Sequence, residues 1–183
     1  MKNTDAQYKS IIEGCREIFK LKTKDYGTAW RILRPSSLTD QIFIKASRIR
    51  SIQEKGEMKI QESIEGEFKA MVNYSIMAMI QLEHPVKEGD YSIDEDVLFE
   101  SYDSYAQETK DLMMDKNHDY GEAWRDMRIS SMTDLILMKL LRIKQIEEND
   151  GQTLISEGLK SNYQDILNYS VFALILLSEG KSI

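Results

Sequence analysis

The sequence DYGTAWRILR at residues 25–34 recurs as DYGEAWRDMR at residues 119–128, a displacement of 94 residues. The match continues beyond this stretch and, after a slip of one residue, rejoins where the tripeptide NYS at residues 73–75 recurs at residues 168–170. Many of the repeated residues are polar, whereas a duplicated scaffold needs only its apolar pattern to return. We therefore infer that a functional site was duplicated. The alternative is a recent duplication whose surface has not yet diverged.

Composition limits the class of protein that the chain can form. The 183 residues are enough for one well-buried globule, whereas each copy alone would be marginal, so we expect the copies to pack on each other. The net charge of −7 argues against a duplex nucleic-acid partner, because such binding depends on neutralising phosphates. The single cysteine, Cys15, and the lack of an apolar signal or membrane-spanning run predict a cytoplasmic protein without membrane contact.

The spacing of apolar residues predicts three helices in each copy. The first helix of copy one carries apolar side chains at intervals of three and four residues: Tyr8, Ile11, Ile12, Cys15, Ile18 and Phe19. Its counterpart in copy two follows a capping pattern at residues 92–95. The second helices are predicted to start at Ser37 and Ser131 and to end near Gly56 and Gly151.

The third helices are the most apolar segments of the chain. They carry Ile60, Ile64, Phe68 and Met71 in copy one, and Ile155, Leu159, Tyr163 and Ile166 in copy two. Because their C-terminal halves are apolar on all sides, we expect them at the centre. The prediction is an all-α fold in which duplicated three-helix units pack as a single helical bundle with pseudo-twofold symmetry. Residues 1–84 form repeat one, residues 85–92 the linker and residues 93–183 repeat two.

A lysine lies in the middle of the apolar stripe of each second helix. Lys45 and its counterpart Lys139 need an acid or an anionic ligand, unless the side chain reaches solvent along its own stem. Arg48 and Arg142 lie beside these lysines, so each Lys–Arg pair is a candidate phosphate clamp. The acids expected to contact the lysines are Asp25 or Glu62 in repeat one, and Asp119, Glu157 or Asp165 in repeat two.

The third helix of repeat two also carries a polar strip. Its members are Glu157, Ser161, Asp165 and Asn168, with Tyr169 at the edge. Glu157 and Asp165 are candidate ligands of a magnesium ion, because Mg²⁺ is commonly held by one or two carboxylates together with nucleotide phosphates. The alternative is a solvated helix face. In repeat one Gly66 and Ala70 replace Ser161 and Asp165, so we expect repeat two to hold the more complete site.

The repeated loop after each first helix offers an acid, aromatic rings and a guanidinium. These groups are Asp25, Tyr26, Trp30 and Arg31 in repeat one, and Asp119, Tyr120, Trp124 and Arg125 in repeat two. They suit stacking on a base and hydrogen bonding to its edge. The alternative is structural, with a turn at Gly27, the tryptophan in the core and Arg31 paired with Asp25.

These motifs resemble those of the nucleotide modification associated domain 1 family: a K-x-x-D-Y-G loop, a K-x-x-R helix and an acidic helix ending in N-Y. In repeat two they correspond to residues 116–121, to Lys139 with Arg142, and to Glu157, Asp165, Asn168 and Tyr169. The resemblance covers nearly the whole chain, once per repeat, and implies a link to nucleotide or DNA-base modification. The layout is also loosely similar to the all-α nucleoside triphosphate pyrophosphatases, although only residues 62–65 match one of their magnesium motifs.

We therefore expect a protein that binds a small-molecule nucleotide or phosphorylated base, with magnesium as the candidate cofactor. The ligand-binding candidates are the loop residues, both Lys–Arg pairs, and Asn168 with Tyr169. Whether the protein is an enzyme stays open, as does the formation of a homodimer. The alternative function is a non-catalytic helical module that binds a protein partner.

Overall fold

The structure is a computed structural model, and it describes residues 3–59, 62–154 and 157–183. Repeat one contains α1 (Thr4–Tyr26), α2 (Pro35–Lys55) and α3 (Ile64–Glu83). Repeat two contains α4 (Glu95–Tyr120), α5 (Ile129–Glu148) and α6 (Leu159–Ser178). A short 3₁₀ helix joins the first two helices of each repeat, η1 (Ala29–Ile32) and η2 (Ala123–Asp126).

Within the described ranges the fold is all-α. The only β pairing found there is an isolated bridge between Lys87 and Asp90 in the linker. None of the described helices is both long and apolar enough to cross a membrane.

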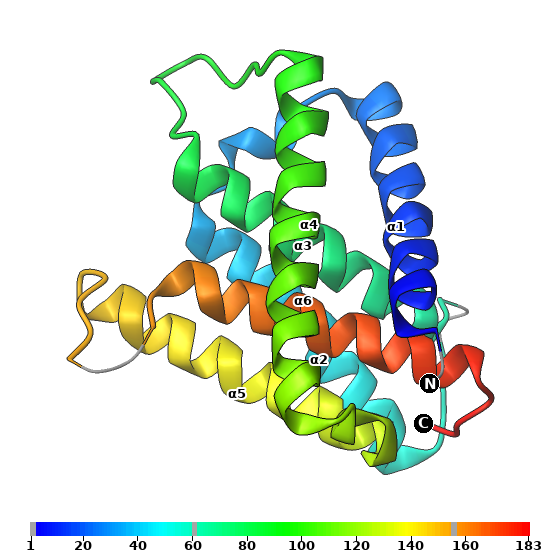
Figure 1. The fold of residues 1–183 in the computed structure, drawn as a ribbon. Helices are drawn as coiled ribbons and strands as arrows, with labels where there is room; N and C mark the ends of the chain where they lie inside the picture. The colour runs from blue at the N-terminus through cyan, green and yellow to red at the C-terminus, as the bar shows by residue number, and fades with distance from the viewer. Residues whose placement is uncertain (1–2, 60–61, 155–156) are drawn as a thin grey trace.

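The helices form three layers, and each layer contains one helix from each repeat (Figure 1). The central layer pairs α3 with α6, which make the most extensive contact in the molecule. On one side α2 packs on α3, α5 packs on α6, and the two outer helices also contact each other. On the other side α1 and α4 cross the central pair. Because every helix contacts its counterpart, the pseudo-twofold axis runs through all three layers.

One apolar core holds the two repeats together. Its fully buried side chains come from all six helices and include Phe68 on α3 and Tyr163 on α6. The central helices are buried nearly all round, as their apolar sequences predict. The predicted packing of the two units through their third helices is therefore confirmed.

Several predicted helix starts are wrong by a few residues. The second helices begin at Pro35 and Ile129, two residues before the predicted serines, and no side chain caps them. Proline fits the first turn of a helix, because the N–H groups of that turn have no partner within the helix and the N–H that proline lacks is therefore not missed. The fourth helix is capped by Asp94, whose carboxylate accepts from the amides of Asp96 and Val97, and not by Ser92. Ile60 and Ile155 lie outside the described residues.

Candidate ligand-binding sites

The repeated asparagine of each central helix links the two repeats. Tyr8 on α1 donates its hydroxyl proton to Asn168 Oδ1 at 2.8 Å, and Tyr102 on α4 donates to Asn73 Oδ1 at 2.7 Å. Each asparagine also donates through Nδ2 to a main-chain carbonyl, of Thr109 or of Cys15. Both asparagines are buried, so these bonds satisfy groups that would otherwise be costly. Their recurrence follows from the pseudo-twofold packing, and Asn168 is engaged in it.

The Lys–Arg pair of repeat one is occupied by an acid of the chain itself. Lys45 Nζ lies 3.2 Å from Glu67 Oε2, and Arg48 Nη1 lies 3.1 Å from Glu67 Oε1. Glu67 is only 4% exposed, so the two cations compensate a carboxylate that is almost entirely removed from water. The prediction that Lys45 contacts a carboxylate is confirmed, but the predicted partners Asp25 and Glu62 are wrong. Only the main-chain carbonyl of Glu62 takes part, as an acceptor from Arg48.

The corresponding pair in repeat two is arranged differently. Lys139 Nζ contacts Asp165 Oδ2 at 2.6 Å, as predicted, and Lys116 contacts the other oxygen of the same carboxylate at 3.2 Å. Asn162 occupies the position equivalent to Glu67. Arg142 is therefore exposed and forms no ion pair with the described residues, in contrast to Arg48.

A polar cleft of about 640 Å³ opens beside this pair. Its wall contains Lys139, Arg142 and Asn162, and the loop after α5 supplies Asn149, Gln152, Thr153 and Glu157. The cleft combines Arg142 and the Asp165-paired Lys139 with several hydrogen-bonding groups and the carboxylate of Glu157. The exposed guanidinium of Arg142 suits a ligand with negatively charged oxygens.

Asp165 and Glu157 line different cavities. Glu157 lies at the cleft and accepts a hydrogen bond from Ser161 at 2.8 Å, whereas Asp165 lies between its two lysines. Across the described ranges, no group of three or more acidic, histidine or cysteine side chains is placed to hold a metal ion. Lysine cations thus neutralise the buried carboxylate of repeat two.

The repeated loops end the first helices and present a tyrosine to solvent. Gly27 and Gly121 follow the helices with φ of 61° and 63°, a backbone conformation that glycine adopts without strain. Tyr26 and Tyr120 are 74% and 76% exposed, so both rings are available for stacking. The neighbouring acids are exposed too, and among the described residues the pairing of Asp25 with Arg31 that belonged to the structural alternative is not found.

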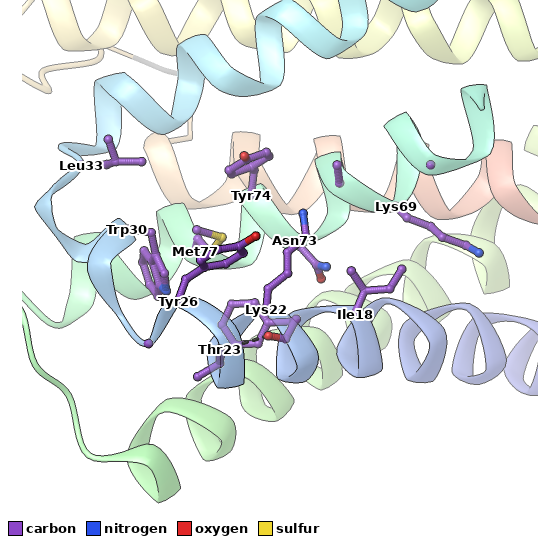
Figure 2. A pocket seen from close by; sticks show the side chains of 14 residues that line it. Ile18, Lys22, Thr23, Tyr26, Trp30, Leu33, Lys69, Asn73, Tyr74 and Met77 are labelled. Carbon is purple, nitrogen blue, oxygen red and sulfur yellow. Dashed lines mark hydrogen bonds between the residues drawn. The ribbon is translucent and has the colours of Figure 1, made fainter. Parts of the chain in front are cut away.

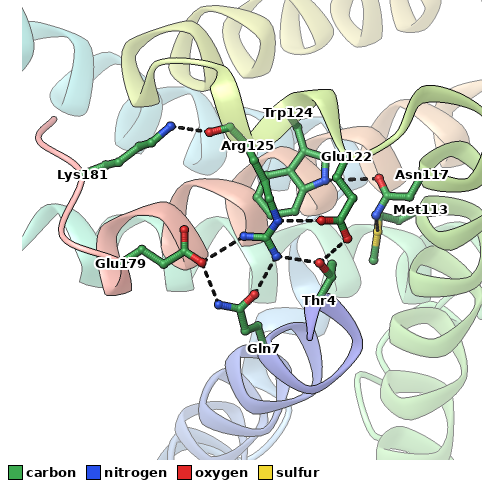
Figure 3. Close-up of polar contacts among 9 residues, drawn as sticks. All are labelled: Thr4, Gln7, Met113, Asn117, Glu122, Trp124, Arg125, Glu179 and Lys181. Atoms are coloured by element: carbon green, nitrogen blue, oxygen red, sulfur yellow. Dashed lines mark hydrogen bonds and ion pairs between the residues drawn. The ribbon is translucent and has the colours of Figure 1, made fainter. Parts of the chain in front are cut away.

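The repeated arginines of these loops bind other parts of the protein. Arg31 is buried and donates to Gln81 Oε1 at 2.6 Å. Arg125 donates to Glu122 at 2.7 Å and Glu179 at 3.0 Å, and its guanidinium lies 4.4 Å from the centre of the Trp124 ring (Figure 3). Figure 3 also shows its bonds to Thr4 and Gln7 of α1. Arg125 therefore ties η2 to the two ends of the chain.

Each repeat has a cavity between the end of its first helix, its loop and its third helix. In repeat one the volume is about 360 Å³, and in repeat two about 290 Å³. Equivalent residues line both, namely Lys22, Tyr26, Trp30, Asn73 and Tyr74 in repeat one, and Lys116, Tyr120, Trp124, Asn168 and Tyr169 in repeat two. Figure 2 shows the first of these cavities, with Lys22 extending across it from α1. The predicted aromatic residues are thus brought together with a lysine.

The tryptophan environments differ between the two cavities. Trp124 is buried and stacks on Phe172, with ring centres 4.2 Å apart and planes inclined by 5°. Its Nε1 donates to Asn117 at 3.2 Å. Trp30 has Met77 at the position of Phe172, and its buried Nε1 has no hydrogen-bond partner within the described structure.

The sequence prediction missed three residues that shape these sites. Lys22 and Lys116 recur with the 94-residue displacement, so a comparison of the two repeats identifies them. Glu67 has no acidic counterpart, and a search for repeated residues therefore passes over it.

Cys15 is not a nucleophile candidate, because it is fully buried and burial raises the pKa of its thiol to about 12.

The fold and the paired sites define the class as an all-α protein built from a duplicated three-helix unit. The family model of nucleotide modification associated domain 1 matches it twice, over residues 22–82 and 116–177. These matches cover more than half of the chain, which therefore belongs to this family, and each begins at a lysine that lines a cavity. The family name associates the protein with nucleotide modification. Searches of curated proteins and of solved structures gave no match.

Proposed function

We propose that the protein binds a nucleotide or phosphorylated base through repeat two, with the phosphate groups on Lys139 and Arg142. The observation that carries this proposal is the position of Glu67 in repeat one. There the carboxylate of Glu67 contacts the equivalent lysine and arginine, 3.2 Å and 3.1 Å away. The Glu67 carboxylate therefore shows where an anionic group contacts both cations of a Lys–Arg pair. In repeat two that place is beside an open cleft, and the residue there is the neutral Asn162.

Charge and geometry support a phosphate at this position. Arginine binds phosphate oxygens through two parallel hydrogen bonds, and Arg142 is exposed without an acidic partner in the described ranges. The cleft volume of about 640 Å³ lies within the ordinary range of ligand pockets. In this proposal a magnesium ion binds together with the phosphates, and Glu157 is the carboxylate of the cleft that coordinates it.

The test measures binding of nucleoside mono-, di- and triphosphates by thermal shift and titration calorimetry, with and without magnesium. A ligand at 100 times its dissociation constant adds about 2.7 kcal/mol of stability. Asn162→Glu places the acid of repeat one in repeat two and is expected to abolish binding. Arg142→Gln is expected to weaken binding about tenfold or more, since a charge-assisted hydrogen bond is lost.

Arg48→Gln is the matched control in repeat one, and it should leave nucleotide affinity unchanged although it disturbs Glu67. Equal effects of the two arginine substitutions would contradict the assignment to repeat two. If no nucleotide binds to the parent protein under any condition, the non-catalytic interaction module becomes the better description. Glu157→Gln should remove only the part of the affinity that depends on magnesium.

A further inference from the structure

Two of the substitutions that distinguish the cavity of repeat one from that of repeat two remove bulk from its third helix. Ala70 replaces Asp165, and Met77 replaces Phe172. The sequence suggested a degenerate site at this point, because an acid is missing. In the structure the same changes leave a larger cavity whose walls are mostly apolar, which is the usual character of a small-molecule site.

Repeat two shows what fits against the tryptophan. The Phe172 ring lies parallel to Trp124 with a centre-to-centre distance of 4.2 Å, so a flat ring occupies that face. In repeat one the equivalent Met77 and Trp30 both border the cavity. The methionine side chain is flexible, so a planar ligand that displaces it can take the position relative to Trp30 that Phe172 takes relative to Trp124.

The hydrogen bonding of the tryptophans supports the same conclusion. Asn117 accepts from Trp124 Nε1, but the equivalent Thr23 donates its hydroxyl to the carbonyl of Phe19. Trp30 Nε1 is thus a buried donor with no acceptor in the described ranges, which is costly unless a ligand supplies one. Tyr26 borders the same cavity and is 74% exposed, so its ring can turn aside without exposing the core.

We propose that the cavity of repeat one binds a planar aromatic heterocycle of the nucleobase type. Its ring stacks on the face of Trp30, and an oxygen of a substituent on that ring accepts the in-plane Nε1–H of the indole at its edge. Lys22 crosses the cavity in Figure 2 and has no acidic partner in the described structure, so it meets a carbonyl oxygen or an anionic substituent of the ligand. The site is separate from the cleft at Arg142, and it does not depend on phosphate binding there.

The experiment titrates adenosine, guanosine, cytidine and thymidine into the full chain by calorimetry. These nucleosides carry no phosphate, so the cleft of repeat two contributes little to their affinity. Met77→Phe covers Trp30 as Phe172 covers Trp124, and it is expected to reduce affinity by at least about tenfold. Thr23→Asn gives Trp30 the internal acceptor that its counterpart has, and should weaken binding about fivefold to tenfold.

Arg142→Gln is the control and should leave nucleoside affinity unchanged, which separates this proposal from the phosphate site. Circular dichroism and the melting temperature check that each variant is folded. Should Met77→Phe fail to fold, Thr23→Asn still tests the tryptophan contact. The absence of binding for all four nucleosides overturns the proposal, and so does parent affinity in the folded variants.

Discussion

Glu67→Gln tests whether the acid of repeat one stands in for an anion. The carboxylate is 4% exposed and contacts Lys45 and Arg48, whose side chains are 23% and 21% exposed. Removing one partner of a fully buried pair costs about 3–5 kcal/mol. Both cations keep some contact with water here, and Arg48 keeps its bond to the carbonyl of Glu62, so we expect about 2–3 kcal/mol. For a protein of this size the melting temperature should fall by about 4–12 °C.

The assay is urea denaturation at pH 7, with and without inorganic tripolyphosphate. In the variant the freed Lys45 and Arg48 should bind the anion, and at 100 times its dissociation constant the anion restores about 2.7 kcal/mol. An Arg142→Gln background removes the contribution of the cleft in repeat two. Glu65→Gln is the control, because Glu65 contacts Lys69 at 2.6 Å but is 57% exposed, and its loss should cost less than about 1 kcal/mol.

Two results would refute this reasoning. A cost of Glu67→Gln no larger than that of Glu65→Gln would mean that the buried contacts contribute little. A clear cost that tripolyphosphate does not reduce would mean that the pair is structural and has no affinity for an added anion. The second result would also remove the observation that supports a phosphate in repeat two.

The remaining predictions concern stability. Tyr8→Phe and Tyr102→Phe each leave a buried asparagine oxygen without its donor, so each should cost about 1–3 kcal/mol in urea denaturation, and clearly unequal losses would contradict the pseudo-twofold equivalence. Burial raises the pKa of Glu147 in the folded protein above its value in the unfolded chain. The contribution of Glu147 to stability is therefore fully present below the unfolded pKa and is lost as the pH rises through the folded pKa. Glu147→Gln, which copies Gln53 of repeat one, should therefore melt higher than the parent at pH 7, with the difference vanishing near pH 4; equal melting temperatures at pH 7 would count against it.

The sequence predicted the fold well because the fold depends on patterns that survive substitution. The spacing of apolar residues placed six helices, and the all-round apolar character of residues 171–176 placed the third helices at the centre. Helix starts were less accurate. Proline at the first turn lets α2 begin at Pro35 without a capping side chain. The equivalent α5 also begins without a capping side chain, at Ile129, and proline does not explain that start.

The candidate sites were predicted less completely, because contacts between helices depend on residues that differ between the repeats. Asp165, one of the three acids expected to contact Lys139, does so, and it lies on the polar strip of repeat two. Glu67 lies off that strip, and nothing in the sequence connects it with Lys45. The stacking of Phe172 on Trp124 was also beyond reach, because an apolar residue in an apolar helix gives no sign of its partner.

The differences between the repeats bear on the chemistry of the ligand. The two copies differ in which part of the equivalent region is occupied by their own side chains. Repeat one fills the Lys–Arg pair with the carboxylate of Glu67, and repeat two covers its tryptophan with the ring of Phe172. Within repeat two, the contact of Lys139 with Asp165 joins the cleft to the aromatic cavity, so the two parts are neighbours. A ligand that met both parts would carry an anionic group beside a flat ring, and that is the chemistry of a nucleotide.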